Sequence, residues 1–219
     1  FRVDFGMRHD RINRKGSVAH RDEHDAHDEE HGDDDHDEEH AEIDYFDHDV
    51  NNTSYALTLS REITNSLNAS LGLAFVERAP SATELFMNGP HLATARFEVG
   101  NTTLDSERSQ NIDLNFQYQK NGFFANLTIF RNNVTDYIYL LDETEDEHKE
   151  HEGEDHEGLV LANYLQQDAS LDGYEFEIGT VFELENGNLS VSYGRDSVDG
   201  KFDRGGRIPR VIPTRNIYD

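Results

Sequence analysis

Hydrophobic and polar residues alternate with a period of two through most of this chain. Apolar side chains recur at alternate positions in residues 53–63 and again from Leu67 to Phe75. Residues 109–119, 172–184 and 188–193 repeat the pattern. Such alternation places apolar side chains on one face of a strand and polar side chains on the other. We therefore predict an all-β fold built from antiparallel strands, and no helix in these windows.

The connections between the predicted strands alternate in length. The short turns are residues 64–66, 120–122 and 185–187, and the long segments are residues 12–52, 78–107, 137–160 and 198–213. Tight turns at one end of the strands and long loops at the other are typical of outer-membrane β-barrels. The pattern predicts part of such a barrel, about seven to eight strands, with its long loops facing outward. A soluble β-sandwich is the alternative, but strands of about eleven residues and loops that differ so much between the two ends do not favour it.

Negative charge is concentrated in two short segments. The formal net charge is −27, of which residues 20–49 carry −15 and residues 142–157 carry −9. The rest of the chain carries only −3. Dense like charge repels itself and remains solvated, so both segments are expected to be loops on a nearly neutral body. Because nucleic-acid binding relies on lysine and arginine, a nucleic-acid partner is disfavoured.

Both acidic segments are also rich in histidine. The run from His20 to His40 reads HRDEHDAHDEEHGDDDHDEEH, and the run from His148 to His156 reads HKEHEGEDH. Together these two tracts contain nine of the twelve histidines of the chain: His20, His24, His27, His31, His36, His40, His148, His151 and His156. Imidazole beside carboxylate is a ligand set that suits zinc. The tracts predict exchangeable zinc sites, the alternative being a solvated and variable surface loop.

Several classes of protein do not fit this sequence. There is no cysteine, which excludes disulfides and cysteine-containing zinc sites. No run of eighteen apolar residues is present, so no transmembrane helix is predicted. No arrangement of nucleophile, base and acid suggests catalysis, and an enzyme is not predicted. The first residues already have the character of a strand, and we expect residues 1–219 to be an internal part of a longer exported protein.

A family resemblance rests on two stretches of the sequence. Residues 77–101 read ERAPSATELFMNGPHLATARFEVGN and are followed by Leu104, Glu107, Ser109 and Asn111, while residues 208–215 read IPRVIPTR. Both stretches resemble the barrel of TonB-dependent outer-membrane receptors. The GPH-x-AT form, together with the histidine-rich loops, is most similar to the zinc-uptake (ZnuD-type) branch of that family.

The resemblance implies an architecture, a location and partners. It implies that residues 1–219 belong to one barrel domain of twenty-two strands in the outer membrane of a Gram-negative bacterium, with segments 12–52 and 137–160 as extracellular loops. It also implies an N-terminal plug, absent from this chain, and a periplasmic TonB protein that supplies energy through that plug. The expected partners are thus zinc, outer-membrane lipid and TonB, and the expected function is zinc uptake.

His91 and His48 lie outside the two tracts. His91 lies in the motif that resembles the family's, where it is either a zinc ligand, with Glu84 as its companion, or part of a rigid Gly-Pro-His turn with a local hydrogen bond. His48 follows the first tract and is expected to be an incidental extension of it. Glu175 and Glu177 fall on the polar, inward face of a predicted strand, which is polar in any barrel.

Two rival functions are consistent with the same residues. A receptor for haem or another metal chelate would also use histidine, although the tracts contain no aromatic residue before Tyr45 and Phe46. A passive porin or adhesin would carry the acidic loops only as a protective or adhesive surface. An upstream plug and TonB-binding segment would favour active transport over this second rival.

Overall fold

A computed structural model describes residues 1–20, 42–143 and 158–219. These residues form one sheet of ten strands and one short helix. The elements are β1 (Arg2–His20), β2 (Glu42–Thr64), β3 (Leu67–Arg78), α1 (Ala82–Phe86), β4 (Asn88–His91), β5 (Arg96–Val99), β6 (Glu107–Lys120), β7 (Phe123–Asp142), β8 (Val160–Leu184), β9 (Gly187–Phe202) and β10 (Arg215–Tyr218). The predicted all-β antiparallel architecture is confirmed.

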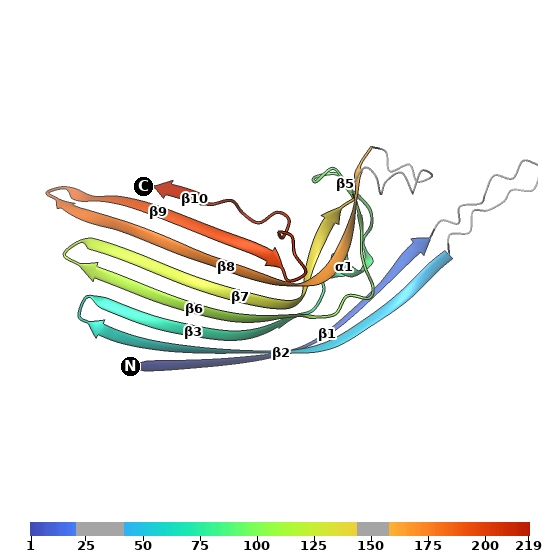
Figure 1. Ribbon diagram of the computed structural model, residues 1–219, viewed down its shortest axis with the longest axis horizontal. Coiled ribbons are helices and arrows are strands. Elements are labelled where there is room, and N and C mark those ends of the chain that lie inside the picture. Colours follow the sequence, from blue (N-terminus) through green and yellow to red (C-terminus); the bar gives the residue numbers. More distant parts are fainter. Residues whose placement is uncertain (21–41, 144–157) are drawn as a thin grey trace, which may run out of the picture.

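Eight of the strands form an antiparallel meander in which each strand pairs with its neighbour, in the order β1-β2-β3-β6-β7-β8-β9-β10. The sheet is curved but not closed, and the turns β2–β3, β6–β7 and β8–β9 lie together at one end (Figure 1). The short α1, β4 and β5 lie at the opposite end, which we call the loop end. None of the helices in the described part of the chain is long and apolar enough to cross a membrane.

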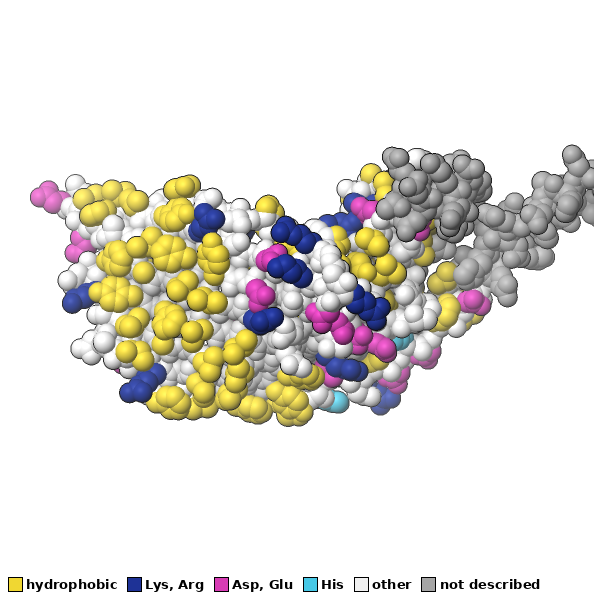
Figure 2. Space-filling model, in the orientation of Figure 1, with side chains coloured by type: hydrophobic (Ala, Val, Ile, Leu, Met, Phe, Trp, Pro, Cys, Tyr) yellow, Lys and Arg dark blue, Asp and Glu magenta, His cyan; other side chains and the backbone are white. Residues whose placement is uncertain are grey.

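The two faces of the meander differ in polarity as the alternation predicts. Across the sheet, Leu59, Leu71, Leu114 and Ile129 occupy one continuous row on the apolar face. The adjacent row, one residue nearer the short turns, has its side chains on the other face. It consists of the polar residues Ser60, Ser70, Asn115, Thr128 and Glu175. Figure 2 shows the hydrophobic side chains gathered over the half of the sheet that carries the short turns, with charged side chains towards the loop end.

The boundary of the apolar face runs obliquely to the rows of paired residues. Its last apolar residues towards the loop end are Met7, Tyr55, Phe75, Ile112, Ile129, Tyr174 and Tyr193. The first three are paired in one row. Ile112, then the paired Ile129 and Tyr174, and then Tyr193 lie in rows successively nearer the short turns. Strands of a membrane barrel are tilted by about 35–45°, so a level band of lipid must cross the rows obliquely. The boundary therefore has the slant that tilted strands in a bilayer require.

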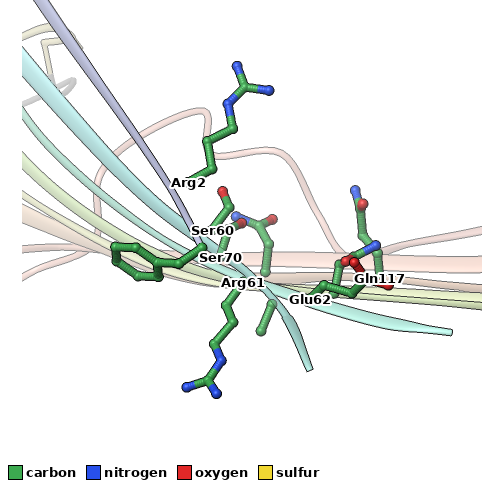
Figure 3. A pocket seen from close by; sticks show the side chains of 10 residues that line it. Arg2, Ser60, Arg61, Glu62, Ser70 and Gln117 are labelled. Atoms are coloured by element: carbon green, nitrogen blue, oxygen red, sulfur yellow. The ribbon is translucent and has the colours of Figure 1, made fainter. Parts of the chain in front are cut away.

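The polar face carries a hollow near the short turns. Side chains of Arg2, Ser60, Ser70, Asn115 and Gln117, from β1, β2, β3 and β6, line it. Figure 3 shows Arg2 on one side of the sheet and Arg61 extending to the other. Polar groups around a hollow are what the interior face of a barrel presents to water or protein.

The strands are longer, and the loops shorter, than the sequence predicts. Residues 12–20 and 42–52, assigned above to a loop, extend β1 and β2 in continuous register up to the pair His20 and Glu42. Residues 137–142 likewise extend β7. We call the paired residues 10–20 and 42–52 the arm. Its outer face is joined by cross-strand ion pairs, with 3.0 Å from Lys15 Nζ to Asp47 and 3.4 Å from Arg11 Nη2 to Asp49. Because charged pairs replace apolar alternation there, the periodicity gives no sign of the strands.

Candidate functional site at the loop end

The segment between β3 and β6, residues 79–106, folds onto the loop end and contains α1, β4 and β5. A capping box begins α1: Glu84 N–H donates to Ser81 Oγ at 3.2 Å, and Ser81 N–H donates to Glu84 Oε2 at 2.6 Å. This reciprocal pair satisfies backbone donors that a helix start leaves free. The sequence ERAPSATELF is thus, in part, a helix-start signal.

Arg78 joins the beginning of the segment to its end. Its Nε donates to Glu107 Oε2 at 2.6 Å, and its Nη atoms donate to both oxygens of Glu84 at 2.9 and 3.1 Å. Burial alone raises the pKa of Glu84, but hydrogen bonds from Arg78 and the backbone of Ser81 lower it overall. Glu84 is therefore a structural carboxylate. Its described partners are Arg78 and Ser81, and the companionship of Glu84 with His91 at a transport site stays a prediction.

The end of the segment closes against α1 through Gly100. The amide of Gly100 donates to the carbonyl of Met87 at 2.6 Å, and the amide of Asn101 donates to the carbonyl of Glu84 at 2.8 Å. A Cβ at Gly100 would lie 2.7 Å from backbone atoms of Leu85 and Met87, so only glycine fits. The glycine and asparagine of the GN motif thereby bring the end of β5 beside α1.

A small apolar core lies beneath this closure. Leu85, Leu104 and Ile138 are buried together, and Phe86 and Tyr164 pack against them. Leu85 and Leu104 are 1% and 2% exposed, so the segment is anchored on β7 and β8 as a packed unit. Residues 79–106 are consequently packed on the strands, whereas the sequence predicts only a long loop there.

Glu98 is the centre of a polar cluster on the hairpin of β4 and β5. It is 2% exposed and receives three side-chain contacts. Its Oε1 lies 2.8 Å from His91 Nδ1 and accepts from Thr94 Oγ1 at 3.2 Å, and its Oε2 accepts from the Tyr164 hydroxyl at 3.1 Å. Burial raises the pKa of Glu98, yet hydrogen bonds from His91, Tyr164 and Thr94 lower it below its ordinary value. Burial and the negative charge of Glu98 raise the pKa of Tyr164 to about 12.

His91 is held at one ring nitrogen and open at the other. Its side chain is 48% exposed, and no described residue hydrogen-bonds its Nε2. A carboxylate on one imidazole nitrogen fixes the tautomer and orients the other nitrogen towards a metal in many metalloproteins. His91 makes the local hydrogen bond of the structural alternative and, through the same contact, has the orientation that a metal ligand needs. Sequence reasoning missed Glu98 and Tyr164, which are 7 and 73 residues away along the chain.

A second ion cluster ties this hairpin to the IPRVIPTR stretch. Asp142 receives both Nε and Nη2 of Arg96, at 2.7 and 2.9 Å, and Nη2 of Arg210 at 2.6 Å. The hydrogen bond from Arg96 is the main cause that lowers the pKa of Asp142. Arg210 also donates to the carbonyl of Leu140 at 2.7 Å. Asp142, close to where the second acidic tract begins, is therefore held by two arginines.

Most of the predicted metal ligands lie outside the described residues. These are His24, His27, His31, His36 and His40 of the first tract and His148, His151 and His156 of the second. His20 is the last residue of β1. Within the described ranges no group of three or more His, Asp or Glu side chains is arranged to hold a metal ion.

The second tract is nevertheless attached beside His91. β5 pairs in parallel with the start of β8, with Arg96 opposite Val160, and the amide of Val160 donates to the carbonyl of Ala95 at 3.2 Å. His91 is itself paired with Arg96. The point where the chain resumes after residues 144–157 is thus two strands away from His91.

Comparison with known families is consistent with this geometry. The family model described as "TonB dependent receptor-like, beta-barrel" matches residues 1–217. The chain belongs to this family. It is accordingly part of a β-barrel of the Gram-negative outer membrane, and the family resemblance predicted from the motifs is confirmed. The family match does not distinguish the zinc-uptake branch from the other branches of the family.

This chain covers less than a third of the length of each relative described below. A hemoglobin and hemoglobin-haptoglobin-binding protein C from Haemophilus influenzae is 32% identical over 95 residues, which is 43% of this chain and 9% of that protein. The copper transporter OprC aligns with a TM-score of 0.58 and 20% identity, over 78% of this chain and 24% of that chain. The Serratia marcescens hemophore receptor HasR, in complex with HasA and heme, aligns with a TM-score of 0.57 and 16% identity. The alignment covers 91% of this chain and 31% of that chain. These structural likenesses show the fold alone.

Proposed function

We propose that this chain is part of a TonB-dependent receptor that takes up zinc across the outer membrane, with its histidine-rich tracts capturing the metal. A receptor for a metal ion or metal-containing ligand is the broader form of the proposal. The observation that carries the narrower form is the position of His91, oriented by buried Glu98 beside the attachment of one histidine-rich tract. No enzymatic step is part of the proposal.

Capture by the tracts would combine two effects. Their carboxylates attract cations through a summed field, and their neutral imidazoles select zinc over calcium and magnesium, which prefer oxygen ligands. Zinc would then pass to a tighter site that includes His91. Because a protonated imidazole cannot bind metal, capture is expected to weaken as the pH falls through about 6.5.

The remaining partners follow from the family. A plug domain in the whole receptor would complete the transport site from inside the barrel, and a periplasmic TonB protein would act through that plug. The apolar face of the sheet would contact outer-membrane lipid, since its exposed large side chains include Phe5, Met7, Leu73, Ile112 and Ile129.

The proposal is tested by calorimetric titration of the whole receptor in detergent at neutral pH, with excess calcium and magnesium present. A variant lacking residues 21–41 and 144–157 keeps every described strand. We expect one tight zinc site to survive this deletion while several weaker sites are lost. In the deletion background, His91→Ala is expected to weaken the tight site at least tenfold.

His9→Ala is the matched control, because His9 is an exposed histidine whose Nδ1 lies 2.9 Å from Thr53 Oγ1 and which lies on β1, away from the loop-end cluster. It is expected to change the zinc affinity less than twofold. Equal affinity in the wild type and in His91→Ala would remove His91 from the proposal. No zinc-specific heat in any variant would contradict zinc as the substrate.

A receptor for haem is the second candidate. It is favoured by the Haemophilus influenzae relative, whose name refers to haemoglobin binding, and by the likeness to a hemophore receptor. Titration of the same receptor with hemin separates the two functions. Binding of hemin with no response to zinc would favour this candidate, and a change in the haem absorption spectrum that His91→Ala abolishes would assign the ligand.

A further inference from the structure

The inner face of the arm carries two basic side chains for which the described residues provide no counter-ion. Arg14 on β1 and His48 on β2 are direct cross-strand partners, so their Cβ atoms are about 5 Å apart. Arg14 Nη1 and His48 Nε2 are both shielded from solvent, and neither has a hydrogen-bond partner in the described part of the chain. Both nitrogens can donate a hydrogen bond, and the arginine is always charged.

This lack of a partner sets Arg14 apart from the other cations nearby. Arg11 and Lys15, its neighbours on the outer face of the same arm, are each within 3.4 Å of a carboxylate. Arg78, Arg96 and Arg210 on the loop end are each held by one or two carboxylates. Among the described residues, Arg14 forms no such ion pair with a carboxylate.

The surroundings of the pair are apolar. The adjacent rows on the same face of the arm are Ile12 with Val50 on one side and Gly16 with Phe46 on the other. Phe86 at the end of α1 covers Gly16 and stacks on Phe46, with ring centroids 6.3 Å apart. Apolar side chains therefore flank the two half-buried basic side chains along the arm, where an anion would compete with little water for the shielded Nη1 and Nε2.

We propose that Arg14 and His48 form a binding site for a small oxyanion, a carboxylate or a phosphate. The guanidinium offers a planar pair of N–H donors that match two oxygens of such a group, and His48 Nε2–H adds a third donor from the opposite strand. The site faces the space between the arm and α1 at the loop end. It goes beyond zinc uptake and does not depend on which metal the receptor carries.

The test uses the whole, metal-stripped receptor in detergent, titrated with citrate and with inorganic phosphate at constant ionic strength. We expect saturable binding that Arg14→Gln weakens at least tenfold. Arg11→Gln, on the outer face of the same arm, removes an equal charge and is expected to change the affinity less than twofold. Tighter binding of citrate would assign a carboxylate ligand and tighter binding of phosphate a phosphate ligand, and either order supports the site.

The role of His48 is tested by two substitutions. His48→Leu removes the donor and is expected to weaken binding at least fivefold, whereas His48→Gln keeps an N–H donor and should retain most of it. Equal losses in Arg14→Gln and Arg11→Gln would show that only net charge matters and would overturn the site.

A second measurement needs no variant. Crystals of the wild-type receptor soaked in selenate are expected to show an anomalous peak between the Arg14 guanidinium and His48 Nε2. Absence of that peak, together with no saturable binding of either anion in solution, would overturn the proposal.

Discussion

In the segment between β3 and β6, the space for an added side-chain atom differs sharply from one residue to another. A Cβ at Gly100 would meet the backbone of Leu85 and Met87, whereas a Cβ at Gly89, eleven residues earlier, would have no neighbouring atom within 4 Å. Glu98 is buried although it is charged, and its three hydrogen-bond donors compensate for that burial. The shape of this segment thus depends on a few individual contacts.

Gly100→Ala is expected to destabilise the segment. The new methyl group would meet backbone atoms, which cannot move aside as a flexible side chain can, and overpacking of this kind costs about 1–3 kcal/mol. Hydrogen exchange in the whole receptor should show faster exchange of the amides of α1 and β5. Gly89→Ala is the control, and equal exchange in the two variants would contradict the assigned close approach.

Glu98→Gln is expected to loosen the β4–β5 hairpin in a pH-dependent way. The pKa of Glu98 lies below its ordinary value of 4.5, so its ionised form stabilises the folded state above that pH. This stabilisation is lost as the pH falls through the lowered pKa. The variant should open more readily by about 1–3 kcal/mol near pH 6, and the difference should shrink in acid.

Hydrogen exchange of the β5 amides in a series from pH 6 down to pH 2.5, corrected for the intrinsic rates, measures this difference. Asp105→Asn is the control, because that carboxylate is exposed on the same segment. A difference between the wild type and Glu98→Gln that does not change with pH would show that the charge of Glu98 has no such role.

At the scale of elements, the arm and the β4–β5 hairpin are the parts that the sequence did not reveal. Strands such as β6 were predictable because one of their faces must meet lipid and is therefore apolar at every second position. The arm has no such requirement and is joined by ion pairs such as Lys15 with Asp47. The hairpin strands have only four residues each, and Ala95 adopts a φ of 52° without the glycine that would have indicated a turn.

The candidate site was predictable only where a residue lies in a motif. His91 could be chosen because it lies in a recognisable motif, but its partner Glu98 depends on how the hairpin pairs. His48 was set aside as an extension of the acidic tract, since only the register of β1 and β2 reveals Arg14 opposite it. Long-range pairing, not composition, decides both cases.

The arm is expected to depend on Phe86 for its position. The Phe86 ring packs on Gly16 and stacks on Phe46, so Phe86→Ala removes the main apolar contact between α1 and the arm. Truncation of a fully buried aromatic side chain costs about 3–5 kcal/mol, and a smaller cost is expected for Phe86, which is partly buried. We expect faster hydrogen exchange in residues 12–19 and 43–50, and unchanged exchange in residues 54–60.

Tyr45→Ala is the matched control for this prediction. Tyr45 is an aromatic residue of the same arm but is 82% exposed, so its loss should leave the exchange of the arm unchanged. Equal effects of the two substitutions would show that Phe86 does not position the arm.

At the scale of the whole molecule, the slanted apolar boundary indicates which face meets lipid. Leu71 lies in the middle of the apolar face, in the same row as Leu59 and Leu114. The adjacent Ser70 lies in the polar row on the other face. The orientation of the sheet in the membrane therefore predicts opposite responses to the same charged substitution at two consecutive residues.

Leu71→Arg is expected to destabilise the receptor by about 2–4 kcal/mol, the cost of an arginine on the lipid-facing side near the bilayer centre. Ser70→Arg places the same side chain on the water-facing or plug-facing side and should cost much less. Unfolding in urea of the receptor folded into liposomes measures both. A larger loss for Ser70→Arg would reverse the assigned faces.

The central claim, that the receptor imports zinc, is tested most directly by uptake. Cells that lack their own high-affinity zinc uptake would express the whole receptor, and accumulation of radioactive zinc would be measured with and without a protonophore that abolishes TonB energy. We predict accumulation that requires energy, that excess calcium does not reduce and that His91→Ala lowers at least tenfold. Equal accumulation in energised and de-energised cells, or in cells without the receptor, would contradict the claim.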